Sequence, residues 1–174
     1  MAVRQQLDAN RELLEAFDHS CRVSEYLISV LPKRLWRAEQ PGGEGRSIAE
    51  IVAHMQSVRR TFAKMGGTDP VPAAVDRSTV TPAQALRALR QSRTSLSGLF
   101  RESLNRGEAR TKGLSRRTVN MMVYLIQHDT HHRGQICMLA RGLGHRLSKD
   151  DVMRVWGWKR LPLQDYRLTG TLHR

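Results

Sequence analysis

The chain has 174 residues, enough for one domain with a hydrophobic core and too few for two domains of ordinary size. Hydrophobic residues make up 40% of the chain, which excludes a disordered protein, while aromatic residues at 5% leave the interior to aliphatic and methionine side chains. The formal net charge of +13 is compatible with an acidic partner such as nucleic acid, although a solvated basic surface is the simpler interpretation.

The first predicted element is a long helix from about Arg4 to Leu31, which ends at Pro32 because proline cannot continue a helix. A glycine-rich loop follows at residues 41–45. A second helix opens with a capping box, in which Ser47 and Glu50 satisfy each other's backbone N–H groups, and it ends near residue 65.

A third helix is predicted to start at Thr81, with proline at its first helical position, and to run to about residue 105. A fourth begins between residues 115 and 118 and ends at a Gly-Leu-Gly signal near residue 143. Ser148 caps a short fifth helix that carries Trp156 and Trp158. Since no strand pattern appears, we predict a single all-α domain over residues 1–174, a four-helix bundle with a short C-terminal extra helix.

Two histidines four residues apart, His128 and His132, lie in the fourth predicted helix. Residues at this spacing are neighbours on one helix face, so both imidazoles could bind the same cation. At about 100° per residue they fall on an inward, apolar stripe, whereas a second stripe of the same helix is polar. The inward stripe also holds Met121, Leu125, Leu139 and Leu143, and the polar stripe holds Asn120, Tyr124, Gln127, His131 and Gln135.

A third histidine, His54, lies on the second predicted helix at the edge of its inner face, which is formed by Ile51, Met55, Val58 and Phe62. Three imidazoles with an open coordination position are typical of a catalytic metal site. The alternative is a set of core histidines with other partners, but burying neutral rings without partners is costly. His19, His145 and His173 have no comparable surroundings, and surface or local polar roles are expected for them.

The fourth helix is also apolar on the opposite side, at Val119, Val123, Ile126, Cys137 and Ala140. A helix that is apolar on two sides is central in the core or shared with another subunit, so a homodimer is a plausible prediction. Cys137 and Cys21 each fall within an apolar helical pattern, which favours buried thiols over a disulfide. With no apolar stretch near the about 20 residues of a membrane span, we expect a cytoplasmic protein with no membrane partner.

Several polar residues near the histidines have two interpretations each. Asp129 is a candidate general base, but a packing carboxylate is the preferred interpretation. Arg133 and Gln135 are candidate substrate anchors, although the helical angle of Arg133 favours an ion pair with another helix or subunit. Tyr124 could reach the rim of a pocket, but surface exposure is expected.

Basic residues gather in two places. Arg87, Arg90 and Arg93 form a positive stripe on the third predicted helix, and the next loop holds Arg106, Arg110, Lys112, Arg116 and Arg117. Aromatic residues for stacking on single strands are missing between them, so nucleic-acid binding is not favoured.

The chain resembles the DinB/YfiT-like metalloenzymes over nearly its whole length. The matching features are the long first helix ending in Leu31-Pro32, residues 47–54 ending in His54, and the run His128-Asp-Thr-His-His132-Arg-Gly-Gln-Ile136, which is the most specific. The resemblance implies a four-helix bundle of this type, often dimeric, with one divalent metal bound by His54, His128 and His132.

Members of that family differ in function, and the resemblance therefore narrows the site more than the reaction. It implies a nickel or zinc enzyme, either a metal-dependent hydrolase or a thiol-dependent transferase, with a small-molecule substrate or a low-molecular-weight thiol as partner. The alternative is a non-catalytic, metal-stabilised and stress-linked binding protein whose basic surface contacts nucleic acid.

Overall fold

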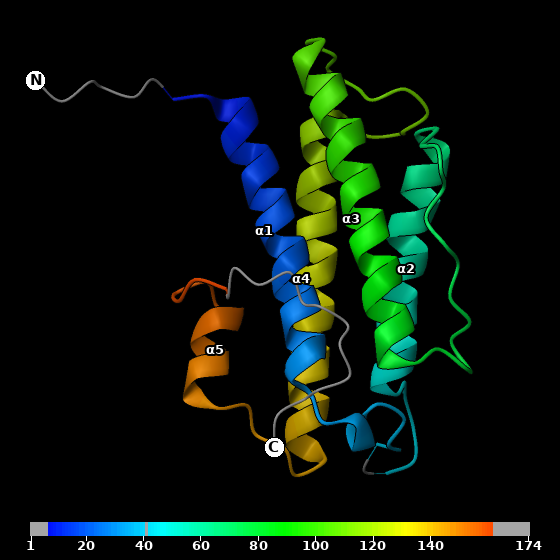
Figure 1. The fold of residues 1–174 in the computed structure, drawn as a ribbon, viewed down its shortest axis with the longest axis vertical. Helices are drawn as coiled ribbons and strands as arrows, with labels where there is room; N and C mark the ends of the chain where they lie inside the picture. The colour runs from blue at the N-terminus through cyan, green and yellow to red at the C-terminus, as the bar shows by residue number, and fades with distance from the viewer. Residues whose placement is uncertain (1–6, 41, 162–174) are drawn as a thin grey trace, which may run out of the picture.

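The computed structural model describes residues 7–40 and 42–161, and every regular element in these ranges is helical. The elements are α1 (Ala9–Val30), the single 3₁₀ turn η1 (Lys33–Leu35), α2 (Ile48–Met65), α3 (Pro82–Asn105), α4 (Thr118–Gly142) and α5 (Lys149–Val155) (Figure 1). The predicted all-α class, with four long helices and a short fifth one, is confirmed.

The helix boundaries follow the capping signals. Asp8 accepts a hydrogen bond from the backbone N–H of Arg11 and caps the N-terminus of α1. The predicted start near Arg4 lies outside the described residues. Both predicted starts of α2 and α3 carry complete capping boxes. The fifth helix ends at Val155, so it is shorter than expected, and Trp156 and Trp158 follow it as exposed side chains.

The four long helices form a bundle in which α3 and α4 lie on diagonal corners. Each of these two helices packs against both α1 and α2, and α5 packs against α1 (Figure 1). The interface between α2 and α4 therefore forms one side of the bundle. Among the described residues, no helix combines the length and apolar character needed to cross a membrane.

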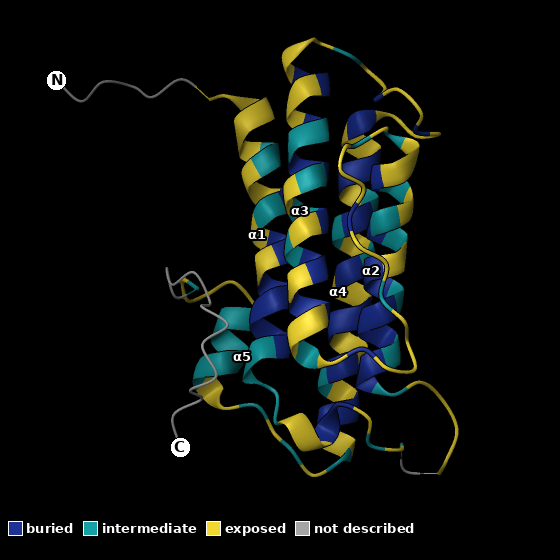
Figure 2. Ribbon diagram, turned by 45° about the vertical axis from the view of Figure 1, so that its right-hand side comes forward, coloured by how far each residue is buried: buried dark blue, intermediate teal, exposed yellow. Residues whose placement is uncertain are grey.

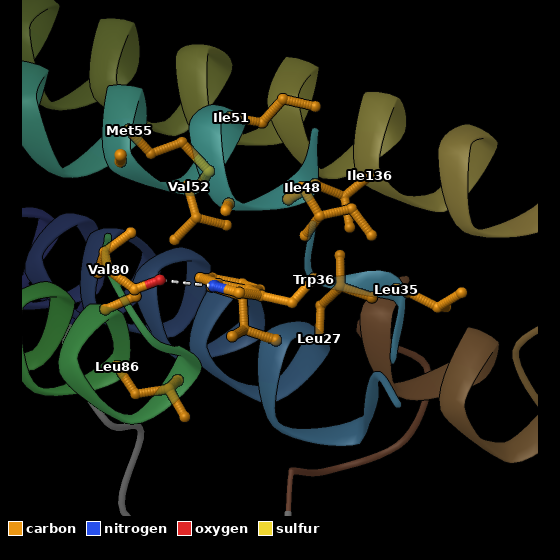
Figure 3. Packing of buried hydrophobic residues seen from close by; sticks show 14 of the residues in the cluster. Leu27, Leu35, Trp36, Ile48, Ile51, Val52, Met55, Val80, Leu86 and Ile136 are labelled. Atoms are coloured by element: carbon orange, nitrogen blue, oxygen red, sulfur yellow. Dashed lines mark hydrogen bonds between the residues drawn. The ribbon is translucent and has the colours of Figure 1, made fainter. Parts of the chain in front are cut away.

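Hydrophobic side chains fill the bundle in two clusters, one toward each end. In the first, Trp36 from the turn after α1 inserts among aliphatic residues of several helices and donates its indole N–H to the carbonyl of Val80 at 2.7 Å (Figure 3). In the second, Phe17 and Phe100 pack edge to face with ring centroids 5.3 Å apart. The buried faces of the long helices point toward one another and the exposed faces outward (Figure 2).

The two apolar sides predicted for α4 differ in their surroundings. Met121, Leu125 and Leu139 of the inward stripe are buried, as expected. On the opposite side Ala140 is also buried, but Val119 and Val123 are exposed to solvent. An uncovered apolar strip therefore remains on the N-terminal half of α4.

Candidate metal centre

Three imidazole rings meet at the interface between α2 and α4. His54 comes from the second turn of α2, and His128 and His132 come from successive turns of α4. The Nε2 atom of His128 lies 3.3 Å from that of His54 and 3.2 Å from that of His132. The sequence placed these three residues in one bundle interior, and the structure brings their ring nitrogens into one cluster.

The separation of the nitrogens suits a small divalent cation. Two nitrogens each about 2.0–2.1 Å from zinc and subtending the tetrahedral angle are about 3.3 Å apart. One ligand atom from each histidine lies within 4.8 Å of the others, so the group could hold a metal ion. Three neutral nitrogen donors leave at least one coordination position without a protein ligand, the arrangement typical of catalytic zinc.

The surroundings of His54 and His132 favour the neutral form of these two rings. His132 is buried, while His54 and His128 are partly buried. Burial, followed by the neighbouring histidines, lowers the pKa of His54 below its ordinary value. Burial also lowers the pKa of His132, against an opposing effect from its hydrogen bond to Gln135. A neutral ring keeps the lone pair that a metal requires.

Gln135 orients the most buried of the three rings. The Nδ1 atom of His132 lies 2.7 Å from Oε1 of Gln135, one helical turn further along α4. An amide oxygen only accepts, so Nδ1 carries the proton and the lone pair of Nε2 faces the cluster. Gln135 was considered as a substrate anchor, and its contact with His132 is a role that the sequence analysis missed.

Asp129 is a structural carboxylate in this arrangement. It is buried and forms an ion pair with the fully buried Arg59 of α2. Burial opposes ionisation of Asp129, but the charge and hydrogen bond of Arg59, together with the neighbouring His128 and Arg133, outweigh it and hold the pKa of the carboxyl below its usual value. The preferred interpretation of Asp129 as a packing carboxylate therefore agrees with the geometry.

One oxygen of Asp129 lies near His128 of the histidine cluster. Its Oδ1 atom and Nδ1 of His128 are 3.8 Å apart, and neither has a hydrogen-bond partner among the described residues. This distance exceeds a hydrogen bond. A carboxylate beside the second ring nitrogen is common behind metal-binding histidines, and Asp129 lies next to this nitrogen of His128.

Arg133 links α4 to α1 rather than to a second carboxylate. Its guanidinium donates to the backbone oxygen of Ser20 at 2.9 Å and to the hydroxyl of Ser24 at 3.0 Å. The predicted contact with another helix is correct, but its partners are neutral oxygens and not an ion-pair partner. The hydroxyl of Ser24 in turn lies 3.5 Å from Asp129.

The remaining neighbours are aromatic or exposed. Tyr124 is half-buried, not simply exposed, because it packs edge-on against Phe62 and lies 5.9 Å from the ring of His128. His131 is exposed, as its place on the polar stripe predicts, although its ring lies 5.1 Å from that of His132.

The other candidate residues lie apart from this cluster. His19 is exposed, His145 is partly buried, and His173 lies outside the described residues. Cys21 and Cys137 are free thiols, and burial raises the pKa of Cys21 to about 12. Neither thiol is in the reactive, deprotonated form at neutral pH.

Part of the predicted basic stripe is neutralised. Arg93 of α3 bonds to Asp18 at 2.8 Å and to Glu25 at 2.9 Å, and Arg90 lies 3.7 Å from the same Glu25. In the next loop Arg106 pairs with Glu108 at 2.8 Å. These arginines therefore contribute less free positive charge than the sequence pattern implied.

Comparison with known protein families matches residues 3–162 to the DinB family, and the chain therefore belongs to this family. Neither the comparison with curated proteins nor the comparison with solved structures found a match.

Removing Arg59 is expected to destabilise the protein far more than removing an exposed ion-pair partner. Arg59→Met leaves the buried Asp129 carboxylate without its counter-charge, which should cost about 3–5 kcal/mol in the free energy of unfolding. Arg22→Gln, which breaks an exposed pair with Asp18, should cost no more than about 1 kcal/mol. Urea denaturation measures both.

The double variant Arg59→Met/Asp129→Leu tests the cause of this loss. Because it removes both buried charges together, it should recover a large part of the stability lost in Arg59→Met. Equal losses in Arg59→Met and Arg22→Gln would show that Arg59 is not held as the structure has it.

Proposed function

We propose that this DinB-family protein is a metal-dependent enzyme in which His54, His128 and His132 hold one divalent cation, zinc or nickel. The observation that carries the proposal is the convergence of three Nε2 atoms, with spacings of 3.2 and 3.3 Å, on one point between α2 and α4. Imidazole nitrogen suits both metals. Without a shared cation these lone pairs would face one another in a partly buried cluster, which is unfavourable.

Of the two reaction classes, thiol-dependent transfer is better supported than hydrolysis. Hydrolysis calls for a general base within reach of the metal. The carboxylate of Asp129 forms an ion pair with Arg59. The carboxylate of Glu50, one turn before His54, accepts hydrogen bonds from Ser47 in the capping box at 3.0 Å. A bound cation would itself act as a Lewis acid that favours the thiolate form of a thiol. Thiol transfer therefore needs no carboxylate from the protein.

We further propose that the protein is a homodimer formed through the N-terminal half of α4. Val119 and Val123 are 44% and 39% exposed there. The solvent-exposed residues of α4 from Val119 to Met138 include no lysine, arginine, aspartate or glutamate. On a chain with a net charge of +13, such an uncharged face is where two copies would repel each other least.

The metal site is tested by elemental mass spectrometry on untagged protein. We expect about one equivalent of metal in the wild type and little in His54→Ala or His128→Ala, because each variant removes one of three ligands. His131→Ala serves as the matched control, since this exposed neighbour lies next to the cluster without joining it. Absence of metal from the wild type after incubation with Zn²⁺ and Ni²⁺ would overturn the proposal.

The reaction class is tested with cobalt in place of the native metal. Addition of dithiothreitol to the Co²⁺-loaded protein should produce a thiolate-to-cobalt charge-transfer absorption, because an open coordination position accepts a thiolate. His128→Ala should lack the band. A loaded wild-type protein whose spectrum does not change with thiol would contradict thiol-dependent transfer while leaving metal binding intact.

The proposed dimer is tested by sedimentation velocity. Val123→Arg places a charge in the apolar strip and should convert a dimer to a monomer with unchanged helical content. Val71→Arg is the matched control, because Val71 has the same 39% exposure but lies in the loop before α3. A wild-type chain that sediments as a monomer at tens of micromolar would refute the dimer.

A further inference from the structure

A groove of about 590 Å³ lies beside the histidine cluster, between the C-terminal half of α4, the start of α2 and the loop before it. This volume is in the range of small-molecule sites. Its walls are formed by Gln40, Gly45, Arg46, Ile51, Gln135, Met138, Leu139 and Gly142.

The groove is joined to the cluster through shared residues. Gln135 lines the groove and accepts the hydrogen bond from Nδ1 of His132 at 2.7 Å. Ile51 lies one turn before His54 on the same helix. A molecule in the groove would therefore lie next to the proposed metal position.

Hydrogen bonds and a glycine conformation constrain the backbone of the loop before α2, which forms the outer wall of the groove. The side-chain N–H of Gln40 donates to the backbone oxygen of Arg46 at 2.7 Å, and the N–H of Gly43 donates to the backbone oxygen of Gln40 at 2.9 Å. Gly45 has φ +107, and a Cβ there would lie 2.8 Å from the Gln40 side chain. The loop thus presents Arg46 from a constrained backbone.

The lining combines one cation with apolar surface. Arg46 is the only charged residue in the lining, its side chain is exposed, and it forms no ion pair within the described ranges. Ile51, Leu139 and the 70% exposed Met138 supply the apolar part. The groove is therefore complementary to a molecule with an apolar body and one negative charge.

A single carboxylate fits this charge better than a phosphate dianion. The backbone N–H groups of Ser47 and Glu50 at the start of α2 are already used by its capping box, and the carboxylate of Glu50 follows Arg46 by four residues in the chain. That negative charge would repel a dianion more strongly than a monoanion, and a single guanidinium balances the one charge of a carboxylate while forming two parallel hydrogen bonds to it.

We propose that this groove is the substrate-binding part of the site and that it takes an apolar organic carboxylate whose anionic group binds Arg46. The inference rests on the proposed metal-dependent function, because it assigns the groove to the substrate of that centre. Gln135 then has two neighbours, the ring of His132 on one side and the bound molecule on the other.

The test uses 4-phenylbutanoate and its neutral counterpart 4-phenylbutanamide as probes, measured by isothermal titration calorimetry on the zinc-incubated full chain. Arg46→Gln should weaken binding of the carboxylate about tenfold or more and leave the amide unchanged, because only the acid bonds to the guanidinium. Met138→Ala should weaken both probes, since the apolar wall is common to them. Arg34→Gln, which removes an exposed arginine outside the groove lining, should change neither.

Metal content measured on the same samples separates the two proposals. Carboxylate binding that depends on Arg46 in a protein without metal would support the groove and refute the metal site. A metal-loaded protein that binds neither probe, or binds the acid equally well with Arg46→Gln, would overturn the groove assignment while leaving the metal site standing.

Discussion

The ion pair between Arg59 and Asp129 is the interaction on which the α2–α4 interface, and with it the histidine cluster, depends. Both groups are almost completely excluded from water, and each belongs to a helix that also contributes to the histidine cluster. A buried charge is tolerated only with a partner, so α2 and α4 are held in one relative register. This register determines where His54 meets His128 and His132, because Asp129 directly follows one of them in the chain.

Around this pair, buried polar groups connect all four long helices, since Arg59 also donates to the backbone oxygen of Leu89 in α3 at 3.4 Å. Arg133 of α4 donates to Ser20 and Ser24 of α1, and Ser24 approaches Asp129. The histidines thus lie on helices whose positions are set by hydrogen bonds and charge as well as by apolar packing. Such networks constrain a structure more narrowly than a purely hydrophobic interface does, since polar partners must meet at fixed distances and angles. Side chains placed in this way are prearranged for one geometry.

Much of the fold followed from local chemistry that sequence reveals directly. The capping boxes at Ser47 and Thr81 marked helix starts, and the period of the α4 pattern separated buried His132 from exposed His131. What could not be foreseen depends on pairs of residues distant in sequence. The sequence analysis did not predict that Arg59 is buried, although it lies on the same helix face as Val52, Met55 and Ala63, which are all buried. A charged residue at such a position is a signal that a buried partner exists elsewhere, but sequence alone does not identify Asp129, 70 positions away.

The three histidines come from segments that are far apart in the sequence, and this separation has a thermodynamic consequence. His54 and His128 are 74 positions apart, with the whole of α3 between them, so the cluster exists only when the bundle is assembled. A cation held there would bind the folded chain and not the unfolded one, so the unfolded population would depend on the concentration of free ion. At a hundred times the dissociation constant, this linkage amounts to about 2.7 kcal/mol. The availability of metal in its surroundings would then help to set the lifetime of the folded protein.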